Sequence, residues 1–458
     1  MAKTKIAYVC SDCGSDYPKW QGRCDDCGAW NTLSEFRTAT PASGASSRPK
    51  AGQFAGYAGS LSDVKTLSEI DLAEVPRMGT GVEELDRVLG GGLVPGSAIL
   101  IGGHPGAGKS TLLLQVLCKL AQAQSAMYVT GEESLQQVAL RARRLSLPTE
   151  NLKMLSETSV ETICAVAEKH NPKLLVVDSI QVMGHEDVQS APGGVAQVRE
   201  CAAYLIRYAK LTNTVLLLVG HVTKEGSLAG PKVLEHMIDC SLMLESSTDN
   251  RFRTLRGVKN RFGAVNELGV FAMTEKGLRE VKNPSAIFLS RADEPAAGSV
   301  VMVVWEGTRP ILVELQALVD DSNFGNPRRL AVGVDQNRLS MLIAVLHRHG
   351  GVQVGDQDVF INVVGGLKVV ETSADLALLL ALISSLRDRA LPTDLVVFGE
   401  VGLSGEIRPV PSGQERLNAA AKHGFKQAIV PEANVPKGGV KGMKVVGVKT
   451  LAAALAEL

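Results

Sequence analysis

The segment from residue 103 to residue 111 constrains the fold of this 458-residue chain more than any other feature. It reads Gly-His-Pro-Gly-Ala-Gly-Lys-Ser-Thr, which satisfies the pattern G-x-x-x-x-G-K-[ST]. The apolar run SAILIG precedes it and the apolar run LLLQVLCKLA follows it. A glycine-rich loop between a strand and a helix directs backbone amides and the helix N-terminus at a phosphate group. The pattern therefore predicts an α/β fold that binds a nucleotide.

Charged and hydroxyl side chains near this loop suit a bound nucleotide. We expect Lys109 to contact the β- and γ-phosphates and Ser110 to bind Mg²⁺. Asp178 ends the apolar run LLVVD and is expected to fix the water shell of that Mg²⁺. The predicted nucleotide-binding residues are Gly103, His104, Pro105, Gly106, Ala107, Gly108, Lys109, Ser110, Thr111 and Asp178.

Hydrolysis also requires a group that polarises water, and the alternative is a domain that binds a nucleotide without turnover. Glu132 and Glu133 follow the strand-like run AMYVTG, and Glu132 is our candidate for that group. The same pair would also fit a solvated charge cluster at a helix N-terminus.

Composition changes divide the chain into four segments. Residues 1–35 contain a cysteine cluster, and residues 36–65 form a linker rich in small residues and proline. Residues 66–283 alternate fully apolar runs with helix-length stretches, which is typical of a parallel sheet covered by helices on both faces. Residues 284–458 form a second α/β domain of ordinary size.

The cysteine cluster has the spacing C-x2-C-x10-C-x2-C. Two such pairs converge four thiolates on one metal ion, so the spacing predicts a closed, structural Zn²⁺ site. Its ligands are Cys10, Cys13, Cys24 and Cys27. Two arrangements are open for the loop beside it. Either its aromatic and basic side chains stack on nucleic-acid bases, or Trp20 and Trp30 pack around the metal site. The residues that would stack are Tyr17, Lys19, Trp20 and Arg23.

Global composition predicts a folded protein of the cytoplasm. Hydrophobic residues make up 45% and charged residues 21% of the chain, and no apolar run is long enough to span a bilayer, so we expect no membrane association. The 48 Lys and Arg balance 48 Asp and Glu, so any nucleic-acid site must be a local patch.

Two further motifs bring a family resemblance. The run from Met78 to Gly96, ahead of the phosphate loop, resembles the RecA/KaiC-type ATPase core, and with the four-cysteine ribbon the chain resembles the bacterial RadA (Sms) family of DNA repair proteins. Residues 259–263 read KNRFG, a signature of that family. The resemblance implies that Lys259 and Arg261 reach the γ-phosphate of a neighbouring subunit. Without it, a basic pair on an exposed strand is usually just solvated.

The same resemblance assigns tasks to other segments. His221 would sense the γ-phosphate, or it is a structural histidine. The segments 183–194 and 223–232 resemble the loops that RecA-like rings project into a central channel, where basic side chains would meet DNA phosphates. Those side chains are Arg199, Lys224 and Lys232.

The C-terminal segment resembles the proteolytic domain of Lon proteases over nearly its whole length. Ser373 matches the nucleophile, but Gln414 stands at the general-base position, and the guanidinium of Arg416 stays protonated. We therefore expect no peptidase activity, and we expect Ser373 to be a helix N-cap. The domain would serve as an oligomerisation scaffold with basic patches on DNA, formed by Arg328, Arg329, Arg338, His347, Arg348 and His349.

Taken over the whole chain, the resemblance implies a DNA-dependent ATPase of homologous recombination and DNA repair. It would be a hexameric ring, of helicase type, that translocates on single-stranded DNA and promotes branch migration of recombination intermediates with RecA. Its cofactors would be ATP, Mg²⁺ and Zn²⁺, and its partners single-stranded and branched DNA, the RecA recombinase and further copies of itself. The alternatives are an ATP-dependent protein-remodelling or proteolytic machine, and a KaiC-like signalling ATPase with no nucleic-acid role.

Overall fold

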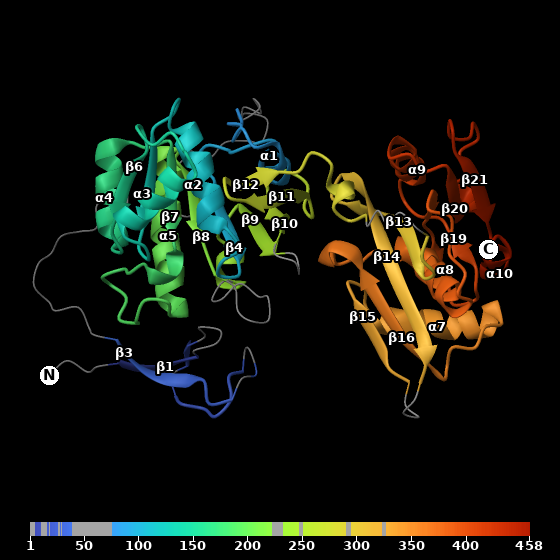
Figure 1. Ribbon diagram of the computed structural model, residues 1–458. Helices are drawn as coiled ribbons and strands as arrows, with labels where there is room; N and C mark the ends of the chain where they lie inside the picture. The colour runs from blue at the N-terminus through green and yellow to red at the C-terminus, as the bar shows by residue number, and fades with distance from the viewer. Residues whose placement is uncertain are drawn as a thin grey trace, which may run out of the picture. The chain divides into compact units, whose positions relative to one another are not determined.

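A computed structural model describes residues 5–10, 16–17, 19–25, 28, 30–38, 76–221, 232–246, 251–289, 295–322 and 327–458 (Figure 1). The chain divides into two compact units. The first comprises Met1–Ser246 and Arg251–Glu280, and the second comprises Ser247–Asn250 and Val281–Leu458. Within the described ranges, no helix has both the length and the apolar character needed to cross a membrane.

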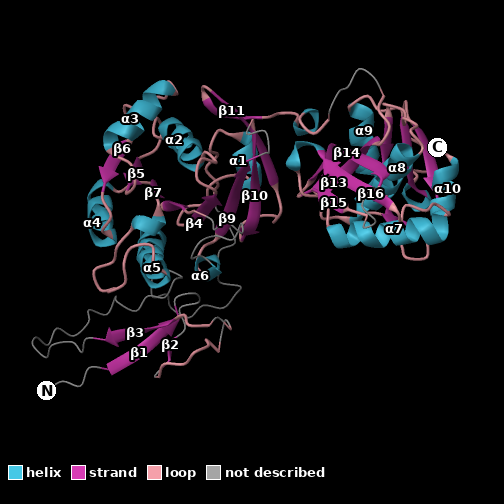
Figure 2. Cartoon of the chain, turned by 60° about the horizontal axis from the view of Figure 1, so that its bottom comes forward, coloured by secondary structure: helices cyan, strands magenta, loops and turns pink. Residues whose placement is uncertain are grey.

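The described part of the first unit contains a nine-stranded sheet with the order β12-β11-β10-β9-β4-β8-β7-β5-β6. Figure 2 shows its strands in magenta, with β10, β9, β4, β7, β5 and β6 following one another across the sheet. Neighbouring strands from β9 to β6 in this order are parallel, and β9 to β12 are joined as antiparallel pairs. The strands are β4 (Ala98–Gly103), β5 (Ala126–Thr130), β6 (Lys153–Ser156), β7 (Leu174–Asp178), β8 (Val215–Val219), β9 (Cys240–Ser246), β10 (Phe252–Asn260), β11 (Leu268–Thr274) and β12 (Gly277–Glu280).

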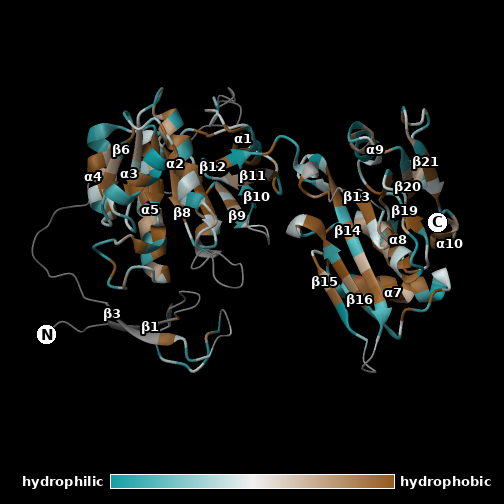
Figure 3. Cartoon of the chain, in the orientation of Figure 1, coloured by the Kyte–Doolittle hydropathy of each residue, from teal (hydrophilic) through white to brown (hydrophobic). Residues whose placement is uncertain are grey.

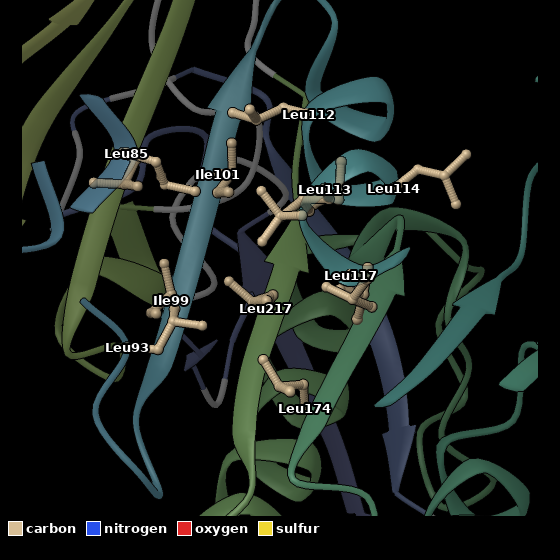
Figure 4. Close-up of a cluster of buried hydrophobic side chains, with 14 of the residues drawn as sticks. Leu85, Leu93, Ile99, Ile101, Leu112, Leu113, Leu114, Leu117, Leu174 and Leu217 are labelled. Atoms are coloured by element: carbon tan, nitrogen blue, oxygen red, sulfur yellow. The ribbon is translucent and has the colours of Figure 1, made fainter. Parts of the chain in front are cut away.

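Helices cover both faces of this sheet, as the apolar runs predicted. Every residue of β4, β5, β7 and β8 is buried, and alternate residues face opposite sides. On one face Ile99 and Leu217 pack with Leu113 (Figure 4), and on the other Leu100 and Leu216 pack against α4 and α5. The helices are α1 (Glu83–Leu89), α2 (Lys109–Leu120), α3 (Leu135–Arg144), α4 (Val160–His170), α5 (Val195–Thr212) and α6 (Lys232–Glu235).

At the N-terminus, β1 (Lys5–Cys10) pairs antiparallel with both β2 (Asp16–Tyr17) and β3 (Leu33–Thr38). This small sheet holds Cys10 at the end of β1 and Leu33 at the start of β3, and both pack with Cys24 in one buried cluster. The predicted ligands Cys13 and Cys27 lie outside the described residues.

The second unit is also α/β. Its seven-stranded sheet has the order β15-β16-β14-β13-β17-β20-β21, with a separate β18-β19 pair. Helix α8 is apolar nearly throughout its length (Figure 3) and is buried from Asp375 to Ser384. The elements are β13 (Ser299–Glu306), β14 (Arg309–Asp321), β15 (Arg329–Val332), α7 (Gln336–Gly350), β16 (Gln357–Val363), α8 (Asp375–Leu386), β17 (Leu395–Val397), β18 (Glu400–Val401), β19 (Ile407–Arg408), α9 (Gly413–Lys422), β20 (Gln427–Pro431), β21 (Lys444–Val448) and α10 (Leu451–Ala456).

Candidate nucleotide-binding site

The glycine-rich loop joins β4 to α2 at the carboxyl end of the parallel strands. A side chain at Gly103 would place its Cβ 2.4 Å from the carbonyl oxygen of Leu244. Gly108 has a φ of +105°, and a Cβ there would lie 3.0 Å from Met273 Cε. Both positions therefore require glycine. The tip of the loop, His104 to Gly106, is exposed, which leaves its backbone accessible to a ligand.

Lys109 is buried beneath the loop. Its ammonium donates to the carbonyl oxygens of Gly103 at 2.8 Å and His104 at 3.1 Å. Burial lowers the pKa of Lys109, and the charges of Asp178 and Glu132 oppose that shift. The lysine is thus held at the base of the loop by carbonyls and carboxylates, where a phosphate would offer it stronger acceptors.

Asp178 ends β7 beside the first turn of α2. It accepts a hydrogen bond from the Tyr128 hydroxyl, and the Ser110 hydroxyl also favours its ionised form. Burial raises the pKa of Asp178, and the hydroxyls of Ser110 and Tyr128 oppose that rise because they favour the ionised carboxylate. The Ser110 hydroxyl and the Asp178 carboxylate offer the oxygen ligands that Mg²⁺ prefers, so the pair fits the predicted metal site.

The two candidate glutamates have different partners. Glu132 accepts a hydrogen bond from the Ser179 hydroxyl, and its Oε1 lies 3.2 Å from His221 Nε2. Glu133 instead pairs with Arg141 on α3. Only Glu132 is therefore in direct hydrogen-bond contact with the groups around Asp178 and Lys109.

His221 joins the lysine and the glutamate. Its Nδ1 lies 3.2 Å from Lys109 Nζ and its Nε2 lies 3.2 Å from Glu132 Oε1. Because an ammonium can only donate, Nδ1 accepts, and the ring proton on Nε2 is donated to the carboxylate. The imidazole thus connects the group expected at the γ-phosphate to the group expected to activate water.

Sequence reasoning missed three residues of this site. Tyr128 and Ser179 hold Asp178 and Glu132, as described above, and Arg253 Nε donates to the carbonyl of Ala107 at 2.9 Å. A tyrosine inside the otherwise apolar strand AMYVT was a usable signal, because a buried hydroxyl needs a partner. No sequence pattern pointed to Arg253, because it reaches the loop only through the fold, from 146 residues away in the chain.

Lys259 and Arg261 lie at the opposite end of the sheet. Cys240 pairs with both Asn260 and Ile99, so the end of β10 is level with the beginning of β4. The glycine-rich loop lies at the other end of β4. Lys259 Nζ donates to two carbonyls of the 235–238 turn, and Arg261 Nη1 donates to Asp239 at 3.1 Å. The Arg261 side chain is 52% exposed.

Several of the other predicted basic contacts have protein partners or lie outside the described residues, whereas His347, Arg348 and His349 are exposed in the last turn of α7. Arg199 pairs with Glu200, Arg328 is bidentate to Asp358, and Arg338 pairs with Asp375. Lys224 lies outside the described residues, as does the side chain of Lys232.

The predicted N-cap role of Ser373 is wrong. Helix α8 is preceded by Ala374 and has no side-chain cap. The Ser373 hydroxyl is buried and accepts a hydrogen bond from Arg416 Nη1 at 3.2 Å, while the same guanidinium binds both oxygens of Glu371. Gln414, at the general-base position, is exposed on α9. The serine therefore faces a permanent cation rather than a base.

Three family models match separate segments of the chain. Residues 8–35 match a rubredoxin metal-binding domain, residues 72–227 an AAA domain, and residues 331–434 the ChlI subunit of Mg-chelatase. Together with the phosphate loop, these matches define the first unit as a zinc ribbon followed by a P-loop ATPase domain.

The relatives identify the family. The chain is 69% identical to the DNA repair protein RadA of Escherichia coli K12 and 47% identical to that of Bacillus subtilis 168, in each case over 99% of both proteins. A solved structure of a KaiC-like protein from Pyrococcus horikoshii OT3 has 20% identity and a TM-score of 0.40, and covers 45% of this chain and 99% of its own. The chain belongs to the family of the DNA repair protein RadA.

Proposed function

We propose that this protein is an ATP-driven motor of homologous recombination. In this proposal it acts in the cytoplasm as a hexameric ring that translocates on single-stranded DNA and promotes branch migration with RecA. The observation that carries the ring is the location of Lys259 and Arg261 at the end of the sheet opposite the glycine-rich loop.

Within one subunit, the site has the groups that ATP hydrolysis needs. Lys109 would bind the β- and γ-phosphates, and Ser110 and Asp178 would hold Mg²⁺, which neutralises phosphate charge when bound. Glu132 would orient and polarise the attacking water. Its carboxylate is restrained by Ser179 and His221, so it is already positioned before substrate binds.

The KNRFG segment of the same subunit cannot reach the γ-phosphate bound at this site. Strand β4 has six residues and so separates the two ends of the sheet by roughly 17 to 20 Å, which is beyond the reach of an arginine side chain. A head-to-tail ring brings one end of each subunit to the other end of its neighbour. Lys259 and Arg261 would then complete the neighbour's site, in the manner of an arginine finger.

Mixing two inactive variants tests this arrangement. Lys109→Ala keeps the KNRFG segment, and Arg261→Ala keeps the glycine-rich loop. Each alone should lose turnover, by about a thousandfold for Arg261→Ala. In a random 1:1 ring, about a quarter of interfaces combine an intact loop with an intact arginine, so ATP hydrolysis should return to about a quarter of wild type.

Failure of the mixture to recover any turnover would refute a shared site, provided that subunit exchange is shown with labelled protein. Arg279→Ala is the matched control, because Arg279 is an exposed arginine of β12, and it should hydrolyse ATP normally.

DNA coupling is tested separately by steady-state hydrolysis with and without single-stranded DNA at two salt concentrations. A DNA motor should be stimulated, and the stimulation should fall as salt rises, because phosphate contacts release counterions. Turnover indifferent to DNA would instead support a protein-remodelling or signalling ATPase. Peptidase activity is opposed by the buried Arg416 guanidinium, which donates a hydrogen bond to the Ser373 hydroxyl where a peptidase would need a base.

A further inference from the structure

Two tryptophans of the zinc ribbon are exposed. Trp20 is 56% exposed and Trp30 is 70% exposed. If these rings packed around the metal site, they would be buried, and their exposure is therefore at odds with that arrangement. Both are large apolar rings, and their exposure on so small a domain points to a ligand.

Backbone pairing brings the two rings to one place. Arg23 and Trp30 form an antiparallel bridge, and the amide of Asn31 donates to the carbonyl of Gly22 at 2.8 Å. A Cβ on Gly22 would lie 3.8 Å from Trp30 Cζ3 and 3.9 Å from Trp20 Cη2. The edges of both indoles therefore lie beside Gly22, which has no side chain to occupy that space.

A guanidinium adds a cation to the pair. Arg23 Cζ lies 5.9 Å from the centroid of the Trp30 ring, and Arg23 Nε donates to the carbonyl of Gly28 at 3.1 Å. Lys19, next to Trp20, is also exposed. The nearby carboxylate of Asp25 accepts a hydrogen bond from Gln21 at 3.0 Å. Flat aromatic rings next to cations match the chemistry of unpaired bases on a phosphate backbone.

We propose that Trp20, Trp30 and Arg23 form a stacking surface for unpaired bases of single-stranded nucleic acid. That this nucleic acid is the DNA strand on which the motor moves rests on the proposed function. The stacking surface lies on the zinc ribbon, apart from the segments 183–194 and 223–232 that were compared with channel loops. Arg23 and Lys19 would contact the phosphates that flank the stacked bases.

The size of the surface favours bases over a protein partner. Two indoles can bury at most about 500 Å² between them. A stable protein interface buries on the order of 1,000 Å² or more, whereas a base needs only one ring face to stack on.

Tryptophan fluorescence of the full-length, zinc-loaded protein tests the proposal directly. The chain has three tryptophans, and Trp305→Phe leaves Trp20 and Trp30 as the emitting residues. A saturable quench is expected on titration with oligo(dT), without added nucleotide, because a stacked base quenches an indole. Anisotropy of a labelled oligo(dT) measures binding in the same samples.

Variants separate stacking from folding. Trp20→Ala with Trp30→Ala should weaken oligo(dT) binding by about a hundredfold, that is, about tenfold per lost ring, and Phe at both positions should restore most of it. Zinc content by atomic absorption must match wild type in every variant. Leu140→Ala is the matched control, since Leu140 is an exposed apolar residue, 64% exposed, on α3, and it should bind normally.

Three outcomes are distinguishable. Quenching that the paired alanine variant loses together with affinity supports the proposal. Binding with unchanged tryptophan emission, or with wild-type affinity in that variant, overturns it. Absence of oligo(dT) binding by the wild-type protein overturns the proposed function as well.

Discussion

Replacement of Arg416 by Leu should strongly destabilise the second unit. The Arg416 side chain is 1% exposed, and its guanidinium lies within hydrogen-bond distance of five acceptor oxygens, on Val303, Pro411, Ser373 and both carboxylate oxygens of Glu371. Leucine fills much of the same volume but leaves these acceptors without a donor. Removal of one partner from a buried ion pair costs about 3 to 5 kcal/mol.

The structure places the expected cost near the lower end of that range. The Glu371 side chain is 26% exposed and can regain water once the guanidinium is gone. With a loss of about 3 kcal/mol and a urea dependence of about 2 kcal/mol per molar, the midpoint of unfolding should fall by about 1.5 M.

Trp305 reports on this transition, because its ring centroid lies 5.8 Å from Arg416 Cζ. In a background with Trp20→Phe and Trp30→Phe, its emission follows urea unfolding of the second unit alone. Arg416→Leu combined with Glu371→Leu should be less destabilised than Arg416→Leu, since no unpaired carboxylate remains. A midpoint of Arg416→Leu within 0.3 M of wild type, about a fifth of the expected shift, would refute the reasoning.

Three further predictions concern the nucleotide site. Glu132→Gln should lower kcat about a hundredfold or more and keep ATP binding, whereas Glu133→Gln should hydrolyse ATP normally; equal effects would contradict the assigned roles. Tyr128→Phe removes a hydrogen bond that favours ionised Asp178, so the pKa of Asp178 should rise further and the acid limb of the pH–rate profile should move to higher pH; an unmoved limb would count against it. Gly108→Val should abolish binding of a fluorescent ATP analogue, because a positive φ and the Met273 contact exclude a branched side chain; retained affinity would show that the loop adapts.

The sequence by itself determined the features that local geometry dictates. The glycine spacing of residues 103–108 admits few backbone paths, and short apolar runs bounded by turn residues, such as residues 98–102, favour buried strands. Both the loop between β4 and α2 and the sheet with two covered faces were therefore predictable. The four-cysteine spacing likewise matched a metal-binding ribbon without any tertiary information.

Only the tertiary structure decided which polar groups meet. Adjacent Glu132 and Glu133 are equivalent in sequence, and only the fold gives them different partners: Ser179, 47 residues from Glu132, donates to Glu132, whereas Glu133 pairs with Arg141. Ser373 was expected to cap a helix, and Arg416, 43 residues along the chain, engages its hydroxyl instead.

The physical reason is that a buried polar group must find a hydrogen-bond partner, and the partner is whatever the fold brings near. Apolar burial depends on periodicity, which a sequence displays directly. Partner choice depends on contacts between distant segments, such as Tyr128 with Asp178 across 50 residues, and no local pattern encodes those.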